Sequence, residues 1–133
     1  MGGRTFRWVR REEPDGWPYE QPTWVFTSRP LNPPPGADVR FADGDVAAAH
    51  PAMVEAARGR DLWVAGGGNL AAQFAERGLL DEVVVSIAPV TLGEGFPLLP
   101  GHVELRPLEV VANGEFACAR YAVVKPGSAP EAG

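Results

Sequence analysis

The stretch DLWVAGGGNLAAQFAERGLLDEVVVSIAPVTLGEGFPLLPG, residues 61–101, decides the fold. It opens with a short apolar run, 61–65, which is typical of a buried strand. Three glycines follow, and residues 69–77 then place apolar side chains at helical spacing, with Asn69 as a cap and Gly78 as a stop. Residues 82–90 form another apolar run. The order strand, glycine turn, helix, strand predicts a parallel crossover in an α/β sheet.

Upstream of this stretch, local signals predict two helices and two strands. A helix over 5–11 would have Thr5 as its N-cap, and a second helix over 45–58 would have Asp45 as its cap. Pro51 either kinks this second helix or starts it. The strands are expected at 23–27 and 39–42, separated by a segment with four prolines.

Downstream, residues 103–112 and 115–124 alternate or are rich in β-formers, and Asn113-Gly114 between them predicts a hairpin. We therefore expect one domain over residues 1–125. The last residues, 126–133, are expected to form a disordered tail.

Composition excludes several classes of protein. The chain has 133 residues, and its formal net charge of -5 argues against a nucleic-acid partner. No apolar run is long enough to cross a bilayer, and no secretory signal is visible, so we expect no membrane partner and a cytoplasmic location. The single cysteine, Cys118, is expected to be a small core residue. No metal site is expected.

The glycine corner is defined here as Gly66, Gly67 and Gly68, with Asn69 and Leu70 after them. It lies between a predicted strand and a predicted helix, where α/β sheets place ligands. Glycine lets the backbone approach a bulky anion, and the helix N-terminus presents N–H groups to it. The alternative is a tight turn without a ligand, because the corner matches neither G-x-G-x-x-G nor a P-loop.

The 61–101 stretch resembles the dihydrofolate-reductase-like superfamily, nearest the C-terminal reductase domain of the bifunctional riboflavin-biosynthesis deaminase-reductase. The matching motifs are GGG, a helix, G-L-L-D-E, a strand ending in A-P-V, and L-G-E-G. Residues 1–6 and 25–29 are similar to its M-G-R-x-T-[FYW] and V-x-[ST]-[RN] motifs. The resemblance implies a three-layer α/β/α fold with a mixed, mostly parallel sheet and a C-terminal antiparallel hairpin.

The same resemblance implies a site for NADPH. The glycine corner, Gly66 to Leu70, would bind its pyrophosphate together with Gly3, Arg4 and Thr5. Ser28 and Arg29 would contact the adenosine 2′-phosphate, to which a hydroxyl and a guanidinium are suited. Alternatively, Thr5 is only a helix cap and Arg29 only a solvated charge.

Other polar residues are weighed separately. Glu94, in a loop near the expected pocket, is a candidate substrate contact. Asp81 and Glu82 are adjacent on a strand and point to opposite faces, so we expect structural roles for both. No catalytic residue is identified.

The chain departs from the family at its N-terminus. Family members start with a strand carrying S-x-D-G, followed by a helix and another strand before the M-G-R motif, whereas this sequence starts at that motif. A misassigned start, a fragment and a shortened relative all account for this difference.

The leading hypothesis is an NADPH-dependent reductase acting on a phosphoribosylaminouracil-like or related heterocyclic substrate. The alternatives are a pterin or dihydrofolate reductase, a non-catalytic nucleotide-binding or interaction module, and a chain without a ligand. Exposed strand edges favour a homodimer.

Overall fold

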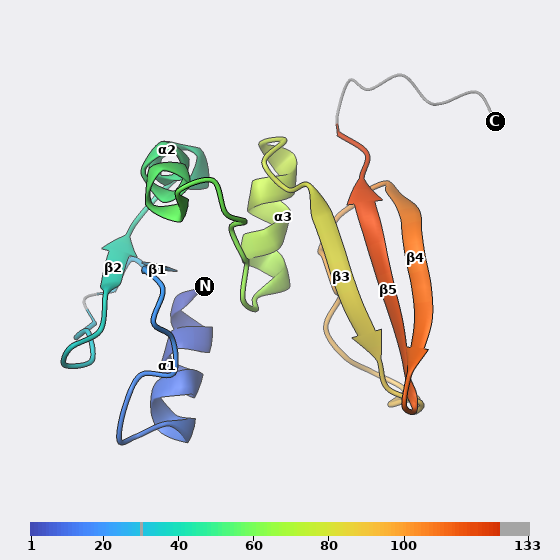
Figure 1. Ribbon diagram of the computed structural model, residues 1–133, viewed down its shortest axis with the longest axis horizontal. Helices are drawn as coiled ribbons and strands as arrows, with labels where there is room; N and C mark the ends of the chain where they lie inside the picture. Colours follow the sequence, from blue (N-terminus) through green and yellow to red (C-terminus); the bar gives the residue numbers. More distant parts are fainter. Residues whose placement is uncertain (30, 126–133) are drawn as a thin grey trace. The chain divides into compact units, whose positions relative to one another are not determined.

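The computed structural model describes residues 1–29 and 31–125 of the chain, so the tail expected at 126–133 lies outside the described residues. The mixed α/β class is confirmed, because the described chain contains both helices and strands, and its strands pair both parallel and antiparallel (Figure 1). The chain divides into two compact units, Met1–Leu70 and Ala71–Gly133, and each is described by itself.

The first unit is built on one parallel pair of strands. Strands β1 (Thr23–Phe26) and β2 (Val39–Ala42) pair in register from Thr23 opposite Val39 to Phe26 opposite Ala42. Both lie where the sequence predicts them, which confirms these two predictions. Val25, at the centre of β1, is fully buried.

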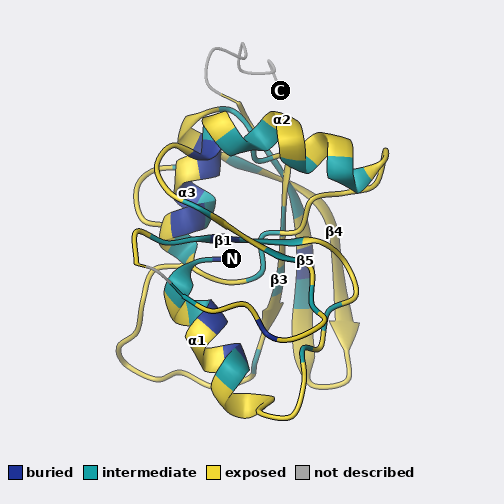
Figure 2. Cartoon of the chain, turned by 90° about the vertical axis from the view of Figure 1, so that its left-hand side faces the viewer, coloured by how far each residue is buried: buried dark blue, intermediate teal, exposed yellow. Residues whose placement is uncertain are grey.

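Helix α1 (Gly3–Glu12) packs its apolar stripe into the core of this unit. Phe6 and Val9, one turn apart on the helix, are buried (Figure 2). The Phe6 ring meets Trp17 at 5.5 Å and Phe41 at 5.6 Å between ring centroids.

The helix begins two residues before the predicted Thr5, so the prediction of Thr5 as N-cap is wrong. Gly2 is the N-cap, because its backbone is extended while its carbonyl already accepts from Phe6 N at 3.0 Å. Thr5 lies inside the first turn, where its hydroxyl is available for another contact.

Helix α2 (Val46–Ala57) confirms the predicted cap. The Asp45 carboxylate accepts a hydrogen bond from Ala47 N at 3.0 Å. Pro51 lies inside the helix, so of the two options the helix does not start there. The helix ends in left-handed backbone, with φ of 52° at Arg58 and 81° at Gly59.

The strand predicted at 61–65 is wrong. The segment leads into the glycine corner, but no strand among the described residues pairs with it. A strand exists only as part of a ladder, so an apolar run without a hydrogen-bonded neighbour is not one.

Helix α3 (Gly68–Glu76) spans the boundary between the two units. It starts at Gly68, so Asn69 is part of the first turn and the prediction of Asn69 as cap is wrong. The predicted stop at Gly78 is confirmed. Gly78 has φ of 69° and donates to Ala75 O, while Leu79 N donates to Phe74 O, which is the Schellman pattern.

The second unit contains an antiparallel sheet in the order β3–β5–β4, formed by β3 (Glu82–Ile87), β4 (Leu105–Asn113) and β5 (Phe116–Val123). The hairpin is confirmed, but its two turn residues are Gly114 and Glu115, one position later than predicted. Gly114 has φ of 60°, as at the first position of a type II′ turn. Strand β3 ends three residues before the predicted Val90.

The register gives this sheet two unlike faces. Val85, Ala119 and Val110 are cross-strand partners, and together with their neighbours two residues along they form what we call the apolar face: Val83, Val85, Ile87, Val110, Ala112, Ala117, Ala119 and Tyr121. The charged face, on the other side, carries Arg120 between Glu82 (2.8 Å) and Glu109 (3.9 Å). Among the helices of the described chain, none has the length and apolar character to cross a membrane.

Candidate functional site

The glycine corner is open and adopts backbone that only glycine accepts easily. Gly66 and Gly67 have φ of 83° and 88°, both in the left-handed region. Gly66, Gly67 and Asn69 are exposed, whereas Leu70 is buried and anchors the helix behind them. The corner therefore presents bare backbone at the start of α3, which is the form that an anion site requires.

Thr5 lies directly against this corner. A Cβ placed on Gly66 would lie 3.2 Å from both Cγ2 and Oγ1 of Thr5. That contact brings the first turn of α1 to the residues that lead into α3, although the two segments are far apart in the sequence. Two helix N-termini consequently meet at one place within the first unit.

A second close approach fixes the start of α1 beside the end of β1. A Cβ on Gly3 would lie 3.2 Å from Thr27 Oγ1, and Gly2 forms a parallel bridge with Phe26. Glycine at position 3 lets the helix start this close to the strand end.

Thr27 also organises the two residues that follow. Its Oγ1 accepts a hydrogen bond from Arg29 N at 3.1 Å and donates to Arg29 O at 3.4 Å. Ser28 and Arg29 are exposed at the end of β1, the strand against which Gly3 packs. Thr27 was not among the predicted site residues. Its position at the strand end, before Ser28-Arg29, was the available signal.

All of the predicted phosphate-binding residues belong to the first unit, and these contacts link the segments that carry them. Gly3 and Thr5 belong to the first turn of α1, and Arg4 is exposed between them. The N-terminal amides of both helices and their positive dipole ends favour a group with negative charge. Chemically, the arrangement can bind a phosphate or diphosphate through backbone N–H groups.

Not every predicted residue joins this group. Glu94 belongs to the second unit and is exposed, so its contact with a substrate stays a prediction. Asp81 and Glu82 have cation partners, since Asp81 pairs with Lys125 and Glu82 with Arg120. These ion pairs are consistent with the structural roles expected for the two carboxylates.

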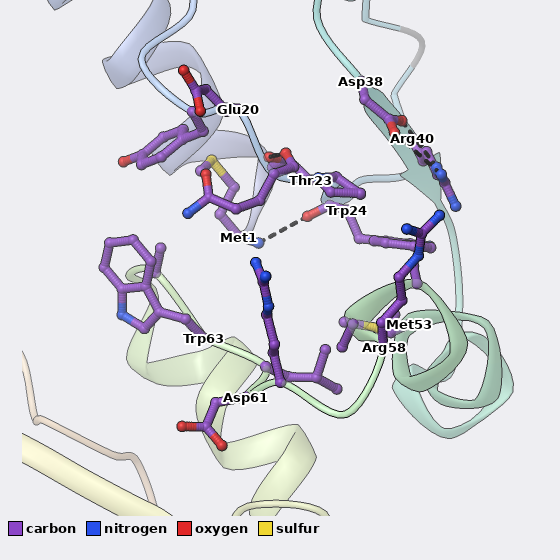
Figure 3. A pocket seen from close by; sticks show the side chains of 18 of the residues that line it. Met1, Glu20, Thr23, Trp24, Asp38, Arg40, Met53, Arg58, Asp61 and Trp63 are labelled. Carbon is purple, nitrogen blue, oxygen red and sulfur yellow. Dashed lines mark hydrogen bonds and ion pairs between the residues drawn. The ribbon is translucent and has the colours of Figure 1, made fainter.

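A separate hollow lies beside β1 in the first unit. It has a volume of about 1050 Å³, and its walls include Trp24 of β1, Met53 of α2 and Trp63 of the following segment (Figure 3). We call it the β1 groove. The residues of the glycine corner do not line it, and neither do Gly3, Arg4 or Thr5. We favour the corner for phosphate, because backbone amides bind an anion and volume alone does not.

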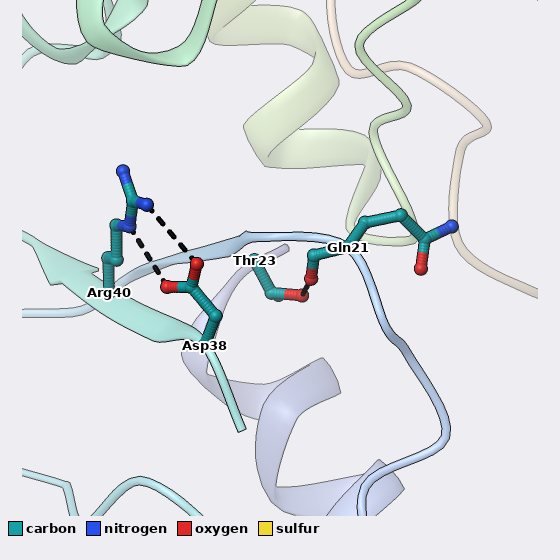
Figure 4. A network of polar contacts seen from close by, with 4 residues as sticks. All are labelled: Gln21, Thr23, Asp38 and Arg40. Atoms are coloured by element: carbon teal, nitrogen blue, oxygen red, sulfur yellow. Dashed lines mark hydrogen bonds and ion pairs between the residues drawn. The ribbon is translucent and has the colours of Figure 1, made fainter. Parts of the chain in front are cut away.

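Polar contacts hold one rim of the β1 groove. Arg40 donates from Nε and Nη2 to the two Asp38 oxygens at 3.0 and 3.2 Å (Figure 4). This hydrogen-bonded pairing raises the pKa of Arg40 above its usual value. The guanidinium also lies 4.6 Å from the ring centroid of Trp24, a cation–π contact.

Comparison with known proteins gives one family. The model of the RibD C-terminal domain matches residues 9–118. YwjB of Bacillus subtilis, a protein without an assigned function, is 32% identical over 99 residues, which is 74% of this chain and 55% of YwjB. The chain thus spans about half the length of that relative.

Solved structures show the same fold. A putative riboflavin biosynthesis protein from Shewanella sp. PV-4 superposes with a TM-score of 0.74 and 24% identity, covering 94% of this chain and 72% of that one. A pyrimidine reductase-like protein from Corynebacterium diphtheriae gives a TM-score of 0.58 and 18% identity, covering 77% of this chain and 50% of its own.

Proposed function

Because the chain belongs to the RibD C-terminal domain family, we propose that it is an NADPH-dependent reductase of a heterocyclic substrate. The family and its structural neighbours support a reductase-like function related to riboflavin biosynthesis. The observation that carries the cofactor proposal is the contact of Thr5 with Gly66, which joins two helix N-termini at an exposed glycine corner.

The residues present fit the diphosphate of such a cofactor. At Gly66 any side chain would enter the space of Thr5, and at Gly67 the positive φ disfavours other residues, so the backbone stays bare. In the proposed complex the amides of α3 and α1 bind the diphosphate oxygens, and the Thr5 hydroxyl offers a further donor. NADPH supplies the hydride when bound, while the chain orients the cofactor and holds its charge.

Ser28 and Arg29 would distinguish NADPH from NADH. Both are exposed after β1, and the backbone of Arg29 is held by Thr27. A guanidinium forms strong, charge-assisted hydrogen bonds with a phosphate, which the ribose hydroxyl of NADH cannot replace. We expect Arg29→Ala to weaken NADPH binding about 10-fold or more and to leave NADH binding unchanged.

The test of the site is a pair of variants at Gly67. Asp and Asn have the same shape and both tolerate positive φ, but only Asp adds a negative charge. A Cβ at this position would meet only Leu70 Cβ, at an ordinary 3.7 Å, and the strain from the positive φ is shared by both variants. NADPH is titrated while tryptophan fluorescence is followed.

We expect Gly67→Asp to bind NADPH at least about 10-fold more weakly than Gly67→Asn, because a carboxylate repels the diphosphate. Equal affinity of the two variants, or no saturable binding by the unmodified chain, would refute the corner as the site. NADPH oxidation with a ribosylaminopyrimidine then tests the reaction. Binding without turnover would favour the non-catalytic nucleotide-binding module.

The homodimer also belongs to this proposal. Ile87 and Val110 on the apolar face of the second unit are 56% and 66% exposed, which is unusual for a face composed only of apolar side chains. A second copy of the chain would cover them.

A further inference from the structure

The hydroxyl of Thr27 closes a tight turn at the end of β1. Its Oγ1 accepts a hydrogen bond from Arg29 N at 3.1 Å and donates to Arg29 O at 3.4 Å. A hydroxyl that bonds the backbone two residues further on takes the place of a backbone bond in a turn. Thr27 is itself fixed, because its N–H donates to Ala42 O of β2 at 2.9 Å. The backbone of Arg29 is therefore tied to the end of the β1–β2 pair.

This backbone is the part of Arg29 that the protein holds. Arg29 is exposed, and none of the described residues forms an ion pair with its guanidinium. An arginine side chain has many rotamers, so the direction in which its Cα presents it decides which region the guanidinium can reach. The turn at Thr27 consequently sets where the charge of Arg29 can act.

The same threonine side chain lies against the start of α1. A Cβ on Gly3 would lie 3.2 Å from Thr27 Oγ1 and 3.3 Å from Thr27 Cβ, so any side chain at position 3 would crowd Thr27. Gly3 is the first residue of α1. One side chain thus contacts the first turn of α1 and also holds the backbone of Arg29.

We propose that Thr27 is a positioning residue, whose side chain sets the spacing between the start of α1 and Arg29 and thereby the preference for NADPH over NADH. This inference rests on the proposed function, in which α1 helps to bind the diphosphate and Arg29 binds the 2′-phosphate. One ribose of NADPH carries both groups, so the parts of the protein that bind them must be held at a matching separation. Holding them before the cofactor arrives lowers the entropy lost on binding.

Two variants of Thr27 separate its hydroxyl from its shape. Thr27→Val keeps the branched shape that suits a strand end but removes both hydrogen bonds to Arg29. Thr27→Ser keeps the hydroxyl and loses only the methyl group. Each variant is titrated with NADPH and with NADH while tryptophan fluorescence is followed, and thermal unfolding confirms that each is folded.

We expect Thr27→Val to bind NADPH about 5-fold more weakly, because the guanidinium is no longer held near the 2′-phosphate. Its affinity for NADH, which lacks this phosphate, should change by less than about 2-fold. Thr27→Ser should bind both cofactors as the unmodified chain does. A role in folding alone would affect both cofactors alike and would not produce this difference.

A double-mutant cycle tests whether Thr27 acts through Arg29. In a chain that already carries Arg29→Ala, adding Thr27→Val should change NADPH affinity by less than about 2-fold, because no guanidinium remains to be positioned. The same loss with and without the Arg29 side chain would mean that Thr27 acts independently of it, and would overturn the proposal.

Three further results would overturn the proposal and leave the cofactor site standing. These are unchanged NADPH affinity in Thr27→Val, equal losses of NADPH and NADH affinity in that variant, and a loss in Thr27→Ser as large as in Thr27→Val. A different result, no saturable NADPH binding by the unmodified chain, would refute the cofactor itself and the role of Thr27 with it.

Discussion

At the scale of single residues, Gly66 carries two constraints at once. Its φ of 83° disfavours other residues, and a Cβ would meet Thr5 at 3.2 Å. Gly59 has nearly the same φ, 81°, but a Cβ added there would meet none of the described residues within 4 Å. Gly59 therefore serves as a control for backbone strain.

We expect Gly59→Ala to lower the free energy of unfolding by about 1 kcal/mol, the cost of left-handed backbone. Gly66→Ala should lower it by about 1–3 kcal/mol more, because the new methyl group crowds Thr5. Urea unfolding measures both variants. If the two losses are equal, the close contact between Thr5 and Gly66 is wrong.

Met1 gives the chain a pH-dependent stability. The pKa of its ammonium group falls from 8.0 to about 6 on folding, because burial disfavours the charged form. Between these values the unfolded chain binds more protons than the folded chain, so stability rises with pH. The penalty is fully present below pH 6 and absent above pH 8.

We expect the free energy of unfolding to increase by up to about 3 kcal/mol from pH 6 to pH 8. Urea unfolding across this range measures the increase. An N-terminally acetylated chain removes the titrating group and should lose this component. The same slope in both would contradict the assignment to Met1.

At the scale of elements, helix α2 contains a proline, Pro51, that destabilises it. Pro51 lies in the second turn, where it has no N–H for Ala47 O and its ring crowds that carbonyl. Because the position is exposed, we expect Pro51→Ala to raise the free energy of unfolding by about 1–3 kcal/mol. Thermal unfolding followed by circular dichroism checks the change, and a lower melting temperature would contradict it.

The elements also show what local sequence can predict. The Asp45 cap, the Gly78 stop and the hairpin at Gly114 depend on residues within a few positions, and all three were found. The strand at 61–65 was not, because strand formation depends on a neighbour that an apolar run does not specify.

The candidate site, too, could be predicted only where it depends on residues close together in the sequence. Glycines at a helix start are visible in the sequence, and the proposed role of residues 3–5 comes from the family resemblance. The contact of Thr5 with Gly66 comes from packing between distant segments, so a local interpretation assigned Thr5 as a cap instead. Thr27 was missed because its two roles appear only when α1 and β1 lie together.

At the scale of the whole molecule, self-association is expected through the apolar face of the second unit. Val110 and Val84 are similarly exposed, at 66% and 69%, but the register places them on opposite faces. We expect Val110→Glu to dissociate the proposed dimer, because a carboxylate is costly to bury in an apolar interface. Val84→Glu, opposite Arg120, should leave the dimer intact.

Sedimentation velocity at micromolar protein concentrations separates these outcomes. Dissociation by Val84→Glu but not by Val110→Glu would place the interface on the charged face. A monomeric unmodified chain would refute the dimer altogether.

The shielded start of the chain also determines how it can be labelled. Lys125 is the only lysine, and its side chain is 45% exposed at the end of the described residues, whereas Met1 is 8% exposed. An amine-reactive dye applied to the folded protein should therefore attach at Lys125 and spare the terminus. A homogeneous fluorescent conjugate follows without any engineered cysteine, and its dye lies outside the unit that carries the glycine corner.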